Sequence, residues 1–250
     1  RNNEIRGASS EGIWLSDFTS GASISEADIT VRDNNISDVG LADVKIEQEA
    51  PGSLNGNEEL VDPSAAAESF LADSSAETVR FWDGQVYNEN GNAVVQEGDS
   101  IQAAIDAAEP GDTIAVADGT YDEQVTIGTD DLTLRAQDGT PELSSDGTVV
   151  QIRAANATIS GFDITGDSTF SSGNLGIDIR GTPDSSSVSV SDTTFEDLYL
   201  GIQTGSGGSY SFTAEDVNVN NSVSGFGHQS TTGSAVIRDS DITVNTQGVG

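Results

Sequence analysis

The stretch Val190-Ser191-Asp192-Thr193-Thr194-Phe195 contains a pattern that recurs through the C-terminal half of the chain, in which apolar residues flank a mainly polar stretch. The same pattern fills residues 159–164, 214–219 and 237–242, and the four copies superimpose without gaps. Their last positions lie 31, 24 and 23 residues apart along the sequence. The chain therefore contains an internal repeat.

A second repeated element lies between these copies and keeps nearly the same period. It is a glycine followed by an apolar residue, and its successive copies lie 25, 24 and 23 residues apart. The four copies are Gly176-Ile177, Gly201-Ile202, Gly225-Phe226 and Gly248-Val249. A period in the low twenties is typical of leucine-rich repeats and of β-solenoids.

Two features of the repeat favour the β-solenoid. Leucine is scarce, and short β-branched runs that alternate with polar residues replace any helical periodicity. We therefore expect an all-β fold, a parallel β-helix in which each period forms one coil. Successive coils would pair in parallel at about 4.8 Å, with Ile, Val and Phe inward and Asp, Asn, Ser and Thr outward.

The start of this solenoid is also visible in the sequence. Residues 100–109 predict a short amphipathic helix, with Ser100 as N-cap, Ile101 and Ile105 on the apolar face and Pro110-Gly111 as its end. Such a helix would cover the open edge of the first coil, which would otherwise template aggregation. The strands that we expect next are residues 113–116, 125–127, 132–135 and 149–152.

The segment from Ser100 to Tyr121, followed by Val125-Thr126-Ile127, resembles the opening of right-handed parallel β-helix proteins of the pectin-lyase-like superfamily. With the acidity of this chain, it is similar to the haloarchaeal surface members of that superfamily. The resemblance covers residues from about 80 to 250 and implies the fold. It says little about activity, because the same fold carries lyases, hydrolases, adhesins and viral spikes.

Three segments are expected. Residues 1–50 repeat both elements, at Gly12-Ile13 and at 31–36, and are interpreted as the terminal coils of a preceding β-helix. Residues 51–79 read as an acidic linker or surface excursion. Residues 80–250 form the main β-helix, which stops within a coil. Either the chain is a fragment of a tandem β-helix protein, or its end coils stack head to tail on other copies.

The large negative net charge of the chain indicates the salt concentration in which the protein works. The chain has 42 Asp and Glu against 9 Lys and Arg, a net charge of −33, with Lys45 as its only lysine. Such a charge opposes compaction unless molar salt screens it, which predicts a halophilic, extracellular or cell-surface protein. No basic patch suits nucleic acid, and no apolar stretch is long enough to span a membrane. Cysteine is absent, which excludes disulfides and thiolate metal sites.

The resemblance implies where lyase chemistry would sit, since polysaccharide lyases of this fold combine a calcium-holding acidic cluster with an Arg or Lys base. Arg180, two residues after Asp178, is the best candidate. An arginine base needs a strongly lowered pKa, so we favour a surface arginine paired with the acidic wall. His228, the only histidine, is assigned no catalytic role.

Repeated acidic and amide residues supply the other candidate sites. Asp192, Asp216 and Asp239 occupy one repeat position and could hold Ca²⁺, although we favour a turn-capping role for them. Candidate glycosylation sites lie at the start of three Asn-X-Ser/Thr triplets. These are Asn35, Asn156 and Asn220.

The sequence favours a non-enzymatic, extracellular β-helix that serves as a rigid surface, adhesive or fibre element of a halophilic archaeon or its virus. Its candidate ligands are polysaccharides, cell-surface glycans and cations. The alternative is a fragment of a polysaccharide lyase or another carbohydrate-active enzyme that acts on acidic polysaccharide. A metal-handling module is a third hypothesis, but copper would require His, Met or Cys ligands, and the chain offers one histidine.

Overall fold

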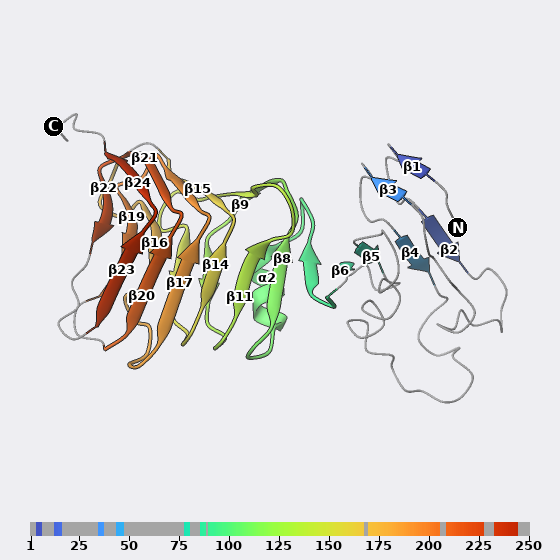
Figure 1. Ribbon diagram of the computed structural model, residues 1–250, viewed down its shortest axis with the longest axis horizontal. Coiled ribbons are helices and arrows are strands. Elements are labelled where there is room, and N and C mark those ends of the chain that lie inside the picture. The colour runs from blue at the N-terminus through green and yellow to red at the C-terminus, as the bar shows by residue number, and fades with distance from the viewer. Residues whose placement is uncertain are drawn as a thin grey trace. The chain divides into compact units, whose positions relative to one another are not determined.

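The structure is a computed structural model, and the chain in it divides into two compact units, residues 1–94 and 95–250 (Figure 1). No described helix is long and apolar enough to cross a membrane. The described residues are 4–6, 13–16, 35–37, 44–47, 78–80, 86–88, 90–167, 170–205, 209–227 and 233–244.

Unit 1 contains short strands in two groups. Strand β1 (Glu4–Arg6) pairs in parallel with β3 (Asn35–Ser37), and β4 (Val44–Glu47) pairs in parallel with β2 (Ile13–Ser16). Strand β4 also pairs in parallel with β5. Beyond it the pairing is antiparallel, through β5 (Thr78–Arg80), β6 (Val86–Asn88) and β7 (Ala93–Val95). The predicted linker, residues 51–79, lies outside the described residues up to position 77.

Unit 2 is a parallel β-solenoid of about six turns, as the repeat predicts. Each complete turn contributes one strand to each of three parallel sheets, which we call sheets I, II and III. Sheet I consists of β8 (Thr113–Val116), β11 (Thr133–Ala136), β14 (Thr158–Ser160), β17 (Ser187–Ser191), β20 (Ser211–Glu215) and β23 (Ser234–Arg238). Sheet II consists of β9 (Thr120–Asp122), β12 (Glu142–Ser144), β15 (Asp163–Thr165), β18 (Thr194–Glu196), β21 (Asn218–Ser222) and β24 (Asp241–Val244). Sheet III consists of β10 (Val125–Ile127), β13 (Val150–Ile152), β16 (Leu175–Asp178), β19 (Leu200–Gln203) and β22 (Ser224–Gly227).

The register confirms the repeat alignment. In sheet I, Val190 pairs with Ile159 on one side and with Ala214 on the other. In sheet II, Phe195 pairs with Ile164 and Val219 in the same way. The spacing of 31 residues between positions 164 and 195 therefore reflects longer loops within one turn, because the strand register is unchanged.

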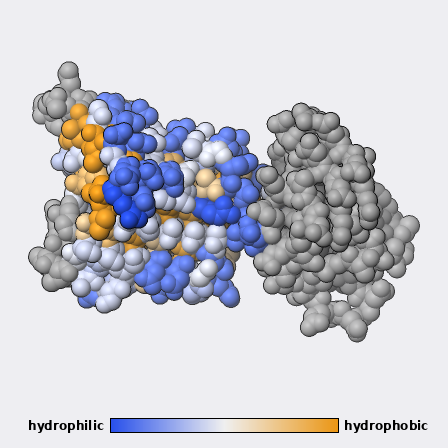
Figure 2. Space-filling model, in the orientation of Figure 1, coloured by the Kyte–Doolittle hydropathy of each residue, from blue (hydrophilic) through white to orange (hydrophobic). Residues whose placement is uncertain are grey.

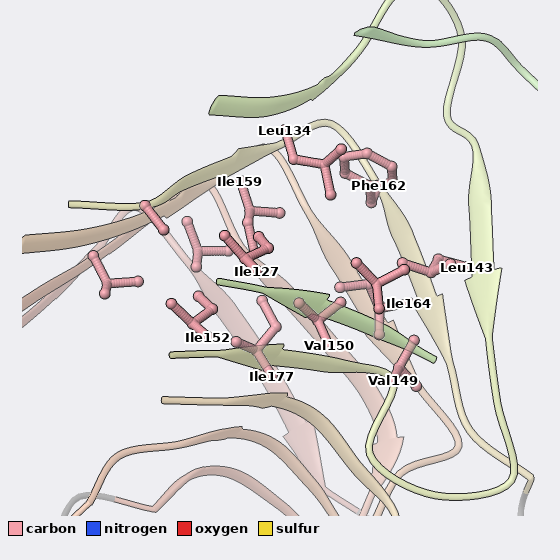
Figure 3. Packing of buried hydrophobic residues seen from close by; sticks show 14 of the residues in the cluster. Ile127, Leu134, Leu143, Val149, Val150, Ile152, Ile159, Phe162, Ile164 and Ile177 are labelled. Carbon is pink, nitrogen blue, oxygen red and sulfur yellow. The ribbon is translucent and has the colours of Figure 1, made fainter. Parts of the chain in front are cut away.

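The core of unit 2 is a stack of inward side chains from successive turns. Buried and partly exposed residues alternate along strands such as β13 and β14, as alternation of side chains along a strand requires, whereas every residue of β16 is buried. Figure 3 shows Val150, Ile152 and Ile177 lying against one another within this stack. Parallel in-register pairing stacks similar apolar side chains on one another, and these stacks fill the narrow core of the solenoid.

A turn with left-handed backbone joins sheet I to sheet II. Asp192, Asp216 and Asp239 have φ of 49°, 52° and 50°, and Gly161 has φ of 86° in the preceding turn. Aspartate is one of the few residues apart from glycine that enters this region readily. The backbone N–H of Asp192 donates to the carbonyl of Glu215 in the next turn, at 3.2 Å.

The helix before the first turn is present. Helix α2 spans Ile101–Ala107, with Ser100 as N-cap and Ile101 and Ile105 buried. Its end falls two residues before the predicted one. The Glu123 carboxylate accepts hydrogen bonds from the backbone N–H groups of Ile101 and Gln102, at 2.7 and 3.2 Å. This anion satisfies donors that a helix N-terminus otherwise leaves open.

The glycine of the second repeated element is a steric requirement of sheet III. A Cβ at Gly176 would lie 2.5 Å from the carbonyl oxygen of Gly201 and 2.6 Å from the Phe195 ring. A Cβ at Gly201 would lie 2.8 Å from the carbonyl oxygen of Gly225. Only glycine lets successive turns approach this closely, which explains why this element keeps the period.

We therefore expect Gly176→Ala to lower the free energy of unfolding by about 1–3 kcal/mol, because the new methyl group must displace backbone and a buried ring. Thermal unfolding in molar KCl, followed by circular dichroism, measures this. Gly128→Ala is the matched control, since a Cβ there meets no atom within 4 Å. Equal melting temperatures for the two variants would contradict the steric explanation.

Candidate functional site

The strongest cluster of charged side chains among the described residues surrounds Asp178, at the end of β16. Strand pairing places Asp178 beside Gln151 of β13 and Gln203 of β19. Arg153 follows β13 directly, and Arg180 follows Asp178 by two residues. The turn-to-turn stacking thus brings one carboxylate and two guanidinium groups together at one side of the solenoid.

Asp178 is held by both arginines. Arg180 donates from Nε to Oδ1 at 2.9 Å and from Nη2 to Oδ2 at 3.2 Å, and its backbone N–H also donates to Oδ1. Arg153 donates from Nη2 to Oδ2 at 3.1 Å. The Asp178 side chain is 5% exposed, against 34% for Arg153 and 52% for Arg180. A buried carboxylate is stable here because both oxygens accept charged donors.

Arg153 joins two turns of the solenoid. Its Nη2 also donates to Oε1 of Gln151 at 3.0 Å, and its Nη1 donates to the carbonyl oxygens of Ile152 and Asp178. These bonds hold the guanidinium at the ends of β13 and β16. The ion-pair cluster therefore links two adjacent turns of the solenoid through hydrogen bonds.

The cluster fixes the protonation of its members. Burial alone would raise the pKa of Asp178, but the hydrogen bonds from Arg180, and then those from Arg153, outweigh it and hold the pKa below its ordinary value. The hydrogen bond to Asp178 raises the pKa of Arg180 above that of a free guanidinium. An arginine that abstracts a proton needs the opposite shift. Arg180 and Asp178, brought together as the sequence suggested, form an ion pair.

Asp178→Asn should lower the free energy of unfolding by about 1–3 kcal/mol at neutral pH, because the arginines lose a charged acceptor. Since the folded pKa is lowered, this contribution is complete above the unfolded pKa of about 3.9 and disappears as pH falls through the lower folded pKa. Urea unfolding at several pH values, in constant molar KCl, measures the difference. Asp146→Asn, at an exposed turn, is the control. A difference that does not shrink in acid would contradict the ion-pair account.

The proposed calcium ladder falls at the turns between sheets I and II. Asp192, Asp216 and Asp239 occupy the same place in three successive turns of the solenoid. Within the described part of the chain, no three acidic or histidine side chains are grouped as metal ligands. The left-handed backbone accounts for aspartate at these positions, and calcium binding there stays a prediction.

The candidate glycosylation sites differ in their surroundings. Asn156 donates from Nδ2 to Oδ1 of Asp131 at 2.9 Å and accepts from the backbone N–H of Ser187 at 3.0 Å. Asn220 is exposed on the outer side of β21. The side chains of Asn35 and Lys45, and all of His228, lie outside the described residues.

Sequence reasoning missed the role of Arg153. Its partner Asp178 lies 25 residues further on, which is one turn of the solenoid. The spacing of the repeat was available as a signal, since 25 residues also separate Gly176 from Gly201. No protein-family model, curated protein or solved structure matches the chain. The parallel β-solenoid and its ion-pair cluster are therefore the basis for any functional assignment.

Proposed function

We propose that the protein is a non-catalytic β-helix that serves as a rigid structural or adhesive element, outside the cell or at its surface, in a high-salt environment. The observation that carries this proposal is the ion-pair cluster. Its aspartate has a lowered pKa and its arginine a raised one, so both groups stay charged instead of exchanging protons. The resemblance of residues 100–127 to pectin-lyase-like β-helix proteins supports the same architecture without supplying a catalyst.

The acidic surface supports the high-salt environment. The strands of sheet II present five carboxylates outward and no described Lys or Arg, and Glu142 and Asp163 lie directly beside each other on neighbouring strands. They belong to Asp122, Glu142, Asp163, Glu196 and Asp241. Like charges on neighbouring strands are destabilising unless salt screens them, and the Debye length falls to about 3 Å at 1 M.

Transfer from molar KCl to dilute buffer should unfold the protein, because the carboxylates of a chain with net charge −33 then repel one another. Circular dichroism during stepwise dilution measures this, with sorbitol at matched water activity as the control for non-ionic effects. A strand signal that persists in dilute buffer would contradict the high-salt assignment.

A fibre-forming role is supported by the last described turn. Ile237, Ile242 and Val244 are 42%, 46% and 41% exposed, whereas their counterparts one turn earlier are fully buried; these are Ala214, Val219 and Ser222. Figure 2 shows apolar side chains gathered at this end of unit 2. An exposed core of this kind favours stacking of a further turn, which either a continuation of the same chain or a head-to-tail neighbour would provide.

Ile242→Asp should therefore reduce self-association in molar KCl, because it places a charge on the apolar end. Sedimentation velocity over a range of protein concentrations measures this, and Thr243→Asp, one residue along the same exposed strand, is the control. Wild-type particles that stay monomeric at high concentration would contradict head-to-tail stacking.

The alternative function is a polysaccharide lyase acting on acidic glycans, for which the two adjacent arginines are the favourable observation. Incubation with polygalacturonate or alginate, with Ca²⁺ or a chelator, should give no rise in the ultraviolet absorbance of unsaturated uronates. A calcium-dependent rise that Arg180→Ala abolishes would overturn the non-catalytic proposal.

A further inference from the structure

The outer side of sheet I differs from the rest of the acidic surface. Figure 1 shows its six strands in unit 2 side by side on the near side of the solenoid. Most of its outward side chains carry hydroxyl groups. They are Thr113, Thr133, Thr158, Ser160, Ser187, Ser189, Ser191, Ser211, Thr213 and Ser234.

The central column of this face is regular. Thr113, Thr133, Thr158, Ser189 and Thr213 are paired in register on five successive turns, and the column ends on the sixth turn with Val236, which is 46% exposed. Each is partly exposed, so no described segment covers the column. Parallel strands repeat at about 4.8 Å, so this column is a ladder of closely spaced hydroxyl groups.

Charge on this face is sparse and, unlike that of the whole chain, not negative, since two arginines accompany one glutamate. The outward charged residues of the sheet I strands in unit 2 are Arg135, Glu215 and Arg238. Glu215 and Arg238 form an ion pair on adjacent strands. Sheet II, in contrast, presents five carboxylates. Because the whole chain carries a net charge of −33, a second acidic molecule meets less repulsion at the hydroxyl face than at sheet II.

We propose that this hydroxyl face is the docking surface for a second copy of the chain, related by a two-fold axis that runs parallel to the strands. This rotation keeps positions along each strand and reverses the order of the turns. Strand β11 then faces β20 of the second copy, and β14 faces β17. The hydroxyl column meets itself, with Thr133 opposite Thr213 and Thr158 opposite Ser189.

The charged residues fit the same rotation. Register places Ala115, Arg135, Ser160, Ser191, Glu215 and Arg238 in one column. The rotation sets Arg135 opposite Glu215 of the second copy, twice by symmetry, and sets Arg238 opposite Ala115. Within the described part of the chain, the Arg135 side chain makes one hydrogen bond, from Nη1 to the carbonyl of Ala136 at 3.1 Å, which leaves other N–H groups of its guanidinium for a partner.

Shifted arrangements lose this match. A shift by one turn in one direction sets Arg135 opposite Arg238 of the second copy, which places like charges together. A shift in the other direction sets Arg135 opposite Ser191 and leaves Glu215 opposite Ala115. Charged pairs at an interface fix register more than they add affinity, so one arrangement is selected.

Charge reversal tests the register. Sedimentation equilibrium of the full chain, at the lowest KCl concentration that keeps the fold, should show a dimer that Arg135→Glu or Glu215→Arg weakens on the order of tenfold. The double variant R135E/E215R should recover most of this loss, because the pair is inverted. Weakening in both single variants without recovery, or a monomeric wild type, would overturn the proposal.

Cross-linking through introduced cysteines tests the face itself. The chain has no cysteine of its own, so no other thiol competes for the reagent. In the variant that combines Thr133→Cys with Thr213→Cys, the two thiols of one chain lie three turns apart, which is about 14 Å. In the proposed dimer, each thiol lies opposite the other kind of thiol in the second copy. A short bis-maleimide should give a covalent dimer. Ser144→Cys with Asn220→Cys, at the corresponding turns of sheet II, is the control. Equal cross-linking of both variants would exclude the hydroxyl face.

This dimer is independent of head-to-tail stacking, and the two can be told apart. The hydroxyl face gives closed pairs, because the two-fold axis uses the face once in each copy. End stacking gives particles that grow with concentration. Ile242→Asp should leave the closed dimer intact, and loss of all association in that variant would assign it to the end of the solenoid.

Discussion

In-register pairing of each turn with the next is the constraint on which the rest of unit 2 depends. Backbone hydrogen bonds between parallel strands fix the position of every residue relative to its counterpart one turn away. This places Phe195 on Ile164, and it leaves so little space at Gly176 that a methyl group would contact the next carbonyl. The same pairing brings Arg153 to Asp178. Core, turns and ion-pair cluster are consequences of one register.

The sequence predicted the elements that repeat and missed those that do not. The two repeated elements predicted the fold and the strand register, and the helix at residues 101–107 followed from Ser100 and its apolar spacing. Antiparallel pairing of β6 was not predicted, because residues 86–95 carry no copy of either element. The Arg153–Asp178 contact was missed because the two residues lie 25 positions apart and meet only when successive turns stack. For Asp192, the sequence allowed both a turn and a metal ligand; the left-handed backbone places it in a turn, and calcium binding stays a prediction.

Charge is distributed unevenly over the solenoid, and this links fold to function. Carboxylates line sheet II, arginines lie on sheet I or on the turns that lead to it from sheet III, and hydroxyl groups fill the outer side of sheet I. Because each sheet gains one strand per turn, a residue type that recurs at the same repeat position forms a continuous surface. The solenoid therefore has faces of different chemistry and an apolar end, and Asp178, the one buried carboxylate among the described residues, pairs with two arginines.

The most direct test of this account is the register itself. Nuclear Overhauser contacts, measured in molar KCl on protein with labelled methyl and aromatic groups, report which side chains touch across turns. The account predicts contacts from Phe195 to both Ile164 and Val219, and from Ile177 to both Val150 and Ile202. Contacts that follow a different spacing, or that connect Phe195 to neither partner, would contradict the parallel solenoid and every surface derived from it.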